Sequence, residues 1–201
     1  MSSQRLSFLD LLRPRKVISM DRILSIQQMI DAINADLKHN TQSHVCFICT
    51  HNSRRSQFSQ AWMSVLSQKL NLPITVYSAG TEKTACNQRT VDSLLRNGFK
   101  LMSKTDDLNN PEFHLEYEGY DVKMTSKTID DLNDVPEFLA IMTCGDADEN
   151  CPYIPAAKHR ISLTYKDPKY ADDTPLEAEA YDRCCNEIKT ELTHILDELK
   201  K

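Results

Sequence analysis

The chain has no long apolar run, no excess of positive charge and no internal repeat. No stretch of its 201 residues approaches the apolar length of a membrane span. Its 24 lysines and arginines face 29 aspartates and glutamates, and the net charge of −5 argues against a general nucleic-acid or polyanion binder. The first residues are polar and charged and lack a signal-peptide core. We therefore expect a cytoplasmic protein that binds neither nucleic acid nor membrane.

The sequence also lacks the cysteine pattern of a disulfide scaffold or a zinc site. Its seven cysteines are an odd number, and cytosolic thiols are kept reduced. Cys144 and Cys151 lie seven residues apart, which is not the usual spacing of zinc ligands. We expect no bound metal and no bound cofactor. Each cysteine must therefore be assigned either to packing or to chemistry.

The segment from His44 to Trp62 combines a strand, a loop and a helix around one cysteine. It begins as an apolar run, reaches Cys49, and then becomes a helix with apolar residues at helical spacing. This layout directs backbone N–H groups and a helix N-terminus at one point, and it favours a thiolate at Cys49. Arg55 can offer its guanidinium to two oxygens of a tetrahedral anion, and Ser56 can donate a hydrogen bond to the sulfur. The segment predicts a cysteine nucleophile with an oxyanion-binding loop made of Thr50, His51, Asn52, Ser53, Arg54 and Arg55.

Apolar strands alternate with helices along the rest of the chain. This order predicts an α/β fold, a doubly wound parallel sheet of about four strands flanked by helices. We expect the later strands at 74–77, 138–142 and 160–163 and the later helices at 88–97 and 175–199. Residues 143–159 are expected to form a loop that carries cysteine and proline.

Residues 1–42 predict a helical N-terminal extension that precedes a catalytic domain at 43–201. Ser7–Leu12 can form a short helix, and Asp21 can cap a longer one. One face of the longer helix is apolar and consists of Ile23, Ile26, Ile30, Ile33 and Leu37. This face needs a partner, which is either the domain's own surface or a second subunit in a homodimer.

Residues from about 101 to 125 predict an inserted β-hairpin. Phe113, Leu115 and Tyr117 alternate with polar residues, a turn at Gly119 follows, and a second alternating segment begins at Tyr120. The hairpin either lies near the active site, where it would shape substrate choice, or extends the edge of the sheet.

Two further segments carry chemical groups. Cys144 and Cys151 stand in a segment with glycine and aspartates, which suits a dithiol pair on a mobile loop. Asp167, followed by Pro168, can pass a proton to a leaving oxygen, although an aspartate before proline is also common in turns. Asp172 and Asp173 are expected to be solvated.

Three motifs resemble, in order, those of the thioredoxin-coupled arsenate reductases and the related low-molecular-weight protein tyrosine phosphatases. They are the loop C-T-H-N-S-R-R-S from Cys49, the segment Y-S-A-G from Tyr77, and C-G-D-A-D-E-N-C-P from Cys144. The resemblance covers roughly residues 44–197. His51 and Arg54 depart from the reductase loop, where glycine and cysteine are typical. We expect His51 either to contact the anion or to point outward, and Arg54 to add positive charge beside the nucleophile.

The resemblance implies a three-cysteine mechanism. Cys49 attacks arsenate with help from Asp167, Cys144 then attacks Cys49, and Cys151 attacks Cys144 to leave a disulfide for a thioredoxin-like partner. The alternative is a phosphatase that hydrolyses phosphate monoesters through a phosphocysteine. A binding or sensor module is a third alternative. Some such reductases bind potassium through a glutamate, but Gln60 stands at that position here, so no metal is expected.

The remaining cysteines are assigned to packing. Cys46 lies inside the first apolar strand and is expected in the core, whereas Cys86 lies in a polar segment. Cys184 and Cys185 are adjacent on the last helix, so we expect one of them to face the core.

Overall fold

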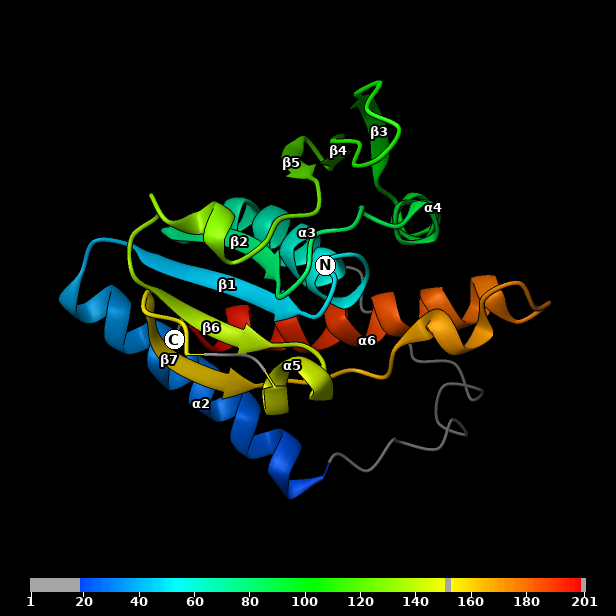
Figure 1. Cartoon of the computed structure of the whole chain (residues 1–201). Coiled ribbons are helices and arrows are strands. Elements are labelled where there is room, and N and C mark those ends of the chain that lie inside the picture. The colour runs from blue at the N-terminus through cyan, green and yellow to red at the C-terminus, as the bar shows by residue number, and fades with distance from the viewer. Residues whose placement is uncertain (1–18, 151–152, 200–201) are drawn as a thin grey trace, which may run out of the picture.

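The computed structural model describes residues 19–150 and 153–199 (Figure 1). The short helix expected at Ser7–Leu12 and the cysteine at Cys151 lie outside the described residues.

A four-stranded parallel sheet forms the centre of the molecule. Its order is β2-β1-β6-β7, with β1 at Ser43–Cys49, β2 at Ile74–Gly80, β6 at Phe138–Met142 and β7 at Ala157–Ser162. The register pairs Cys49 with Gly80 and Ile48 with Met142. The carboxyl ends of β1 and β6 are therefore neighbours, at the edge where parallel α/β sheets bind ligands. The predicted doubly wound parallel sheet is confirmed.

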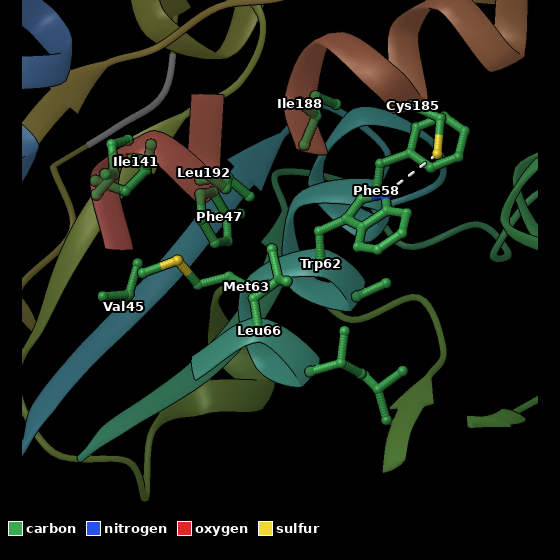
Figure 2. Packing of buried hydrophobic residues seen from close by; sticks show 14 of the residues in the cluster. Val45, Phe47, Phe58, Trp62, Met63, Leu66, Ile141, Cys185, Ile188 and Leu192 are labelled. Carbon is green, nitrogen blue, oxygen red and sulfur yellow. Dashed lines mark hydrogen bonds between the residues drawn. The ribbon is translucent and has the colours of Figure 1, made fainter. Parts of the chain in front are cut away.

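The two faces of this sheet are covered differently. One face carries the helices α2 (Met20–His39), α3 (Arg55–Lys69) and α6 (Glu177–Glu198), which enclose the larger hydrophobic core (Figures 1 and 2). The opposite face is covered by short elements, among them the 3₁₀ turn η1 (Asp130–Leu132) and the helix α5 (Gly145–Asn150). Side chains alternate along β1, so Val45 and Phe47 enter the first core, and Cys46 and Ile48 enter the second.

Helix α2 packs its apolar face against the chain's own domain. Ile26, Met29, Ile30 and Ile33 are buried in the larger core, while Ile23 is 46% exposed, contrary to the expected stripe. The N-cap is Ser19, whose hydroxyl accepts a hydrogen bond from the backbone N–H of Arg22, and not the predicted Asp21. Since the apolar face is covered within one chain, it no longer argues for a homodimer.

The predicted hairpin forms, but it belongs to a second sheet. Strands β4 (Phe113–Tyr117) and β5 (Tyr120–Met124) pair as expected, and β3 (Lys100–Lys104) joins them in an antiparallel sheet of order β3-β4-β5. The alternative prediction, that the hairpin extends the edge of the central sheet, is therefore wrong. The small sheet lies over α3 on the side away from α6 (Figure 1).

Helix α3 is consequently buried on several sides, including positions beyond the apolar ones that its helical spacing indicates. Its glutamines form hydrogen bonds with the edge of the small sheet. The side-chain amide of Gln57 donates to the carbonyl of residue 125 at 2.8 Å, that of Gln60 to residue 123 at 2.9 Å, and that of Gln68 to residue 121 at 3.1 Å. Trp62 packs edge-on against Phe99 and Tyr117, with ring centroids 4.8 and 5.0 Å away. The glutamines satisfy an edge strand that would otherwise expose unpaired carbonyls.

Element boundaries differ modestly from the expectations. Helix α4 spans Gln88–Arg96 and ends at Asn97, after which Gly98 has a φ of +101°, as the Asn-Gly signal predicts. Helix α6 begins at Glu177, and the 3₁₀ turn η2 (Pro168–Ala171) precedes it. The segment after Cys144 forms α5 and not the expected loop, and β7 begins earlier than predicted.

Candidate active site

Cys49 is the last residue of β1 and lies beneath the loop that leads into α3. It is buried, at 4% exposure, and its sulfur lies 3.0 Å from the hydroxyl oxygen of Ser56. Ser56 in turn accepts a hydrogen bond from the side-chain amide of Asn52 at 2.9 Å. The hydroxyl of Ser56 is thereby free to donate its own proton to the sulfur, which is the role that the sequence predicts for it.

The loop after Cys49 turns its carbonyl oxygens away from its centre. Groups outside the loop donate to these oxygens: Glu82 N–H to Thr50, the hydroxyls of Thr84 and Ser126 to His51, Gln57 to Asn52, and Asn87 N–H to Ser53. In a trans peptide the following N–H points opposite to the carbonyl. The N–H groups of residues 51–54 are therefore turned toward the centre of the loop, which makes an anion-binding nest.

Asn52 holds this geometry in place. Its φ of +46° is left-handed, a conformation that asparagine tolerates better than most residues. Its side-chain oxygen accepts hydrogen bonds from Gln57 at 3.1 Å and from the backbone N–H of Lys127 at 2.8 Å. The sequence places Asn52 in the loop, but these partners come from α3 and from the segment after β5.

Gly80 allows the second strand to pass close to the loop. A Cβ at this position would lie 2.7 Å from the backbone nitrogen of Asn52 and 2.7 Å from the carbonyl oxygen of Thr50. Contacts this short do not occur for real Cβ atoms, so a side chain here would displace the loop. The glycine of the Y-S-A-G segment is thus a requirement of the site.

Arg55 and Asp167 form an ion pair at the mouth of the loop. One terminal nitrogen of Arg55 donates to a carboxylate oxygen of Asp167 at 2.7 Å, and the other donates to the carbonyl oxygen of Tyr165 at 3.2 Å. Asp167 also caps η2 by accepting from the N–H of Lys169. The Arg55 Nε is buried and has no hydrogen-bond partner among the described residues. The structure therefore brings the predicted arginine and the predicted acid into contact with each other.

The two residues that depart from the reductase loop do not point their side chains at its centre. His51 is exposed, and its Nε2 lies 3.3 Å from a carboxylate oxygen of Glu82, which is the outward orientation. Arg54 donates to the Tyr181 hydroxyl at 2.8 Å and lies 3.4 Å from Asp172. The positive charge that Arg54 was expected to add is therefore paired with the carboxylate of Asp172.

Asp172 is also not the solvated residue that was expected. It lies mostly out of solvent and accepts a hydrogen bond from Tyr181, which bridges it to Arg54. Burial raises the pKa of Tyr181 to about 12, so its hydroxyl keeps its proton at neutral pH. Nothing in the local sequence indicates this triad, because Arg54 stands more than a hundred residues before Asp172 and Tyr181.

Cys144 lies against the nucleophile loop from the neighbouring strand. It lies two residues after the end of β6, is fully buried, and its sulfur lies 3.5 Å from the hydroxyl oxygen of Thr50. The backbone N–H of Ala147, in the first turn of α5, donates to the same sulfur at 3.4 Å. Cys49 at the end of β1 and Cys144 just beyond β6 thus lie at the same edge of the sheet. Cys151 falls outside the described residues.

The other cysteines are buried and protonated. Burial raises the pKa of Cys86 to about 12 and that of Cys185 to about 11, and it raises the pKa values of Cys46 and Cys184 as well. Cys185 accepts a hydrogen bond from the indole N–H of Trp62 at 3.2 Å (Figure 2). Cys184 and Cys185 are both buried, because α6 is covered by α3 and α4 on one side and by α2 on the other. Cys86 is buried despite its polar neighbours.

Gln60, which stands where a cation-binding glutamate was considered, forms a hydrogen bond with the hydroxyl of Ser78. Within residues 19–150 and 153–199, no group of three or more histidine, cysteine or acidic side chains is arranged to hold a metal ion. In the same part of the chain, no helix is long and apolar enough to cross a membrane.

Comparisons with known proteins agree with this geometry. A curated arsenate reductase of Staphylococcus aureus (strain bovine RF122 / ET3-1) is 31% identical over 117 residues, which cover 58% of this chain and 71% of that protein. The structure of a low molecular weight phosphotyrosine phosphatase from Vibrio cholerae O395 matches with a TM-score of 0.52 and 17% identity, covering 79% of this chain and 97% of that one. The structure of an arsenate reductase from Archaeoglobus fulgidus DSM 4304 matches with a TM-score of 0.52 and 20% identity, and the match covers 76% of this chain and 98% of that one.

The two structural matches, at under 25% identity, bear on the fold alone. The family model of low molecular weight phosphotyrosine protein phosphatases matches residues 44–201, which include the nucleophile loop, Cys144 and Asp167. The chain therefore belongs to the low molecular weight phosphotyrosine protein phosphatase family, and it is an enzyme.

Proposed function

We propose that the protein is an arsenate reductase that uses Cys49, Cys144 and Cys151 in succession. The observation that carries the proposal is the position of Cys144, whose sulfur lies 3.5 Å from the Thr50 hydroxyl in the nucleophile loop. Hydrolysis of a phosphate ester needs no second thiol there, whereas reduction needs one within reach of the first. The curated relatives named arsenate reductase support the same choice.

The first step forms a bond between sulfur and arsenic. Arsenate binds in the nest of N–H groups, and Arg55 exchanges Asp167 for arsenate. Its Nε, which has no partner among the described residues, and the terminal nitrogen that held Asp167 each donate to an arsenate oxygen, while the other terminal nitrogen stays on the Tyr165 carbonyl. Asp167 is thereby released from its ion pair and can carry the proton that leaves with water. The thiolate of Cys49, stabilised by Ser56, attacks arsenic and displaces that water.

The second step reduces arsenic. Cys144 thiolate attacks the sulfur of Cys49, and the electron pair of the sulfur–arsenic bond passes to arsenic, which leaves as arsenite. The two electrons come from the two thiols, which become a Cys49–Cys144 disulfide. Cys151 then attacks Cys144, frees Cys49 and leaves a Cys144–Cys151 disulfide. Helix α5, which lies between these two cysteines in sequence, must open for this exchange.

Restoring the enzyme requires a dithiol reductant from outside. We propose a thioredoxin-type protein, because its two thiols can reduce the Cys144–Cys151 disulfide by the same exchange chemistry. We also propose that residues 43–201 form the catalytic unit and that residues 1–42 are an extension to it.

A phosphatase is the second candidate, and one observation favours it. Cys49, Arg55 and Asp167 already form a complete site for phosphate monoester hydrolysis without Cys144. In that reaction Asp167 protonates the leaving oxygen while Cys49 takes the phosphoryl group. Asp167 then activates water, which releases phosphate from Cys49.

Arsenate-dependent oxidation of NADPH, in the presence of thioredoxin and thioredoxin reductase, tests the proposal. We expect turnover by the parent protein and none by Cys144→Ser. Cys86→Ala is the matched control, because it removes another buried thiol that lies outside the relay, and it should retain turnover. Hydrolysis of para-nitrophenyl phosphate is measured on the same three proteins.

Two outcomes would contradict the reductase. One is the absence of arsenate turnover in a parent protein that hydrolyses the aryl phosphate, with hydrolysis unchanged in Cys144→Ser. The other is arsenate turnover that survives in Cys144→Ser. The first outcome would establish the phosphatase and leave Cys144 with a protective role.

A further inference from the structure

We propose that Arg22, on helix α2, is a positioning residue for Arg55 and Asp167. Helix α2 lies before the segment that the family model matches, which begins at residue 44. The inference rests on the oxyanion chemistry of the proposed site, but not on the choice between arsenate and a phosphate ester.

The guanidinium of Arg22 uses all three of its nitrogens. Nε donates to Glu191 at 2.9 Å, one terminal nitrogen forms an ion pair with the same carboxylate, and the other donates to the carbonyl oxygen of Thr164 at 2.8 Å. Its central carbon lies 4.5 Å from the centre of the Tyr165 ring. Arg22 thus contacts the carbonyl of Thr164 and the ring of Tyr165, while the carboxylate of Glu191 on α6 holds its guanidinium in this orientation.

The segment that Arg22 contacts, residues 164–167, is also the segment that binds the side chain of Arg55. The carbonyl oxygen of Tyr165 accepts from Arg55 at 3.2 Å, and Asp167, two residues later, accepts from the other terminal nitrogen of Arg55. The N–H of Tyr165 donates to the carbonyl of Thr143, beside Cys144. One short stretch of backbone therefore connects the helix outside the matched segment to the catalytic arginine, the acid and the second cysteine.

Attachment of α2 to the domain does not depend on Arg22. Ile26, Met29, Ile30 and Ile33 are buried in the larger core. Near the other end of the helix, Lys158 donates to the carboxylate of Asp36 at 2.9 Å, and this pair lies mostly out of solvent like that of Arg22 and Glu191. Among the described residues, two ion pairs thus hold α2 to the domain, and the pair Arg22–Glu191 is the one that reaches Tyr165.

Removing the Arg22 side chain should not open a new void in the hydrophobic core. Arg22 lines a cavity of about 840 Å³ between α2, α6 and the end of β7, together with Ser19, Thr164, Arg183, Asn186 and Glu191. Truncation enlarges a hollow that already exists and that opens to solvent. Its effect on the site can therefore be separated from an effect on folding.

Binding of inorganic phosphate, measured by isothermal titration calorimetry, tests the proposal without requiring either activity. We expect Arg22→Ala to weaken phosphate binding about tenfold, since Arg55 loses its fixed carbonyl partner and samples orientations that do not face the loop. Arg22→Lys keeps the charge but loses the planar fork, so it should restore only part of the affinity. The control Lys158→Met breaks the other α2 ion pair and should keep phosphate binding within about twofold of the parent.

Thermal unfolding of each variant shows whether α2 remains attached. The proposal is supported if Arg22→Ala and Lys158→Met lower the melting temperature similarly but Arg22→Ala alone loses phosphate affinity. Unchanged affinity in Arg22→Ala, or equal losses in both variants, would overturn it while leaving the proposed reaction intact. Failure of the parent protein to bind phosphate would instead overturn the anion site, and with it both this inference and the proposed function.

Discussion

The two cysteine-bearing segments of the site are held very differently. The loop after Cys49 is fixed by hydrogen bonds from α3 and from the segments around Glu82, Asn87 and Ser126, and Gly80 lets β2 pass against it. The segment after Cys144 is one short helix, which contacts β1 and β6. In this segment a Cβ on Gly145 would meet no neighbouring atom within 4 Å, whereas one on Gly80 would strike backbone at 2.7 Å.

This difference matches what each half of the proposed reaction requires. An oxyanion is stabilised when its donors are fixed before it arrives, so the first segment has to be rigid. Disulfide exchange requires each thiolate to reach a sulfur that was previously out of range, so the second segment has to move. Of the five predictions below, which run from the largest expected effect to the smallest, the first three test this contrast.

Replacing the nucleophile should abolish both candidate reactions while leaving the loop in place. We expect Cys49→Ser to lower turnover about a thousandfold or more, because a serine hydroxyl is a much weaker nucleophile at neutral pH. Phosphate binding should persist, since the N–H groups and Arg55 remain. Steady-state kinetics and calorimetry on the same sample measure the two effects. Loss of phosphate binding would mean that the sulfur itself organises the loop.

Adding one methyl group at Gly80, against the rigid loop, should strongly reduce activity. Gly80→Ala places a Cβ against the backbone of Asn52 and Thr50, and the loop must shift to accommodate it. We expect about a hundredfold loss of kcat/KM, because donors displaced by about 1 Å no longer fit the oxyanion, and about 1–3 kcal/mol of destabilisation. Urea unfolding and kinetics measure both. A variant with parent-like kinetics would show that the loop is not held as closely as the contacts indicate.

The same methyl group at Gly145, in the second segment, should have a small effect that is confined to arsenate turnover. Gly145→Ala meets open space and replaces a poor helix former in α5, so we expect stability to change by at most about 1 kcal/mol and phosphate binding not to change. A firmer α5 should slow arsenate turnover about two- to threefold, because the helix has to open for Cys151 to reach Cys144. Equal effects at Gly80 and Gly145 would remove the contrast between the two segments.

The smallest effect should be seen at the cysteines that take no part in the reaction. Burial raises the pKa of Cys86 to about 12 and that of Cys185 to about 11, so both remain thiols at pH 8 in the folded protein. We expect iodoacetamide at pH 8 to modify Cys49, with protection by phosphate, and to leave Cys86 and Cys185 unmodified until urea unfolds the chain. Peptide mass spectrometry identifies the labelled sites.

The same raised pKa values determine the direction of the stability change with pH. Both thiols stay protonated in the folded state but lose their protons above about pH 8.5 once unfolded. Their contribution to stability is therefore complete below that pH and is lost as the pH rises toward 11 to 12. A urea midpoint that rises between pH 8 and pH 10 would contradict this account.

Local sequence was sufficient for most of the fold. Strand β6 and both strands of the hairpin begin and end where alternation and apolar runs predict, because these patterns match the periodicity of the structure they form. The loop chemistry indicates Cys49 and Arg55 as candidate site residues, and the resemblance adds Asp167; the structure pairs Arg55 with Asp167. The Y-S-A-G segment was noted only as a resemblance, and the need for Gly80 follows from the close approach of β2 to the loop.

Tertiary structure alone decided which groups face one another. Gln57 and Gln60 of α3 are buried because a second sheet and the residue after it present carbonyl oxygens to them. Asp172 is withdrawn from solvent because Arg54 and Tyr181 approach it. Arg22 reaches the catalytic region across more than a hundred residues of sequence, and Ile23 remains exposed although it belongs to the apolar stripe. A side chain's periodicity tells which face of its own element it occupies. It carries no information about the partner that packs there, because that partner comes from a distant part of the chain.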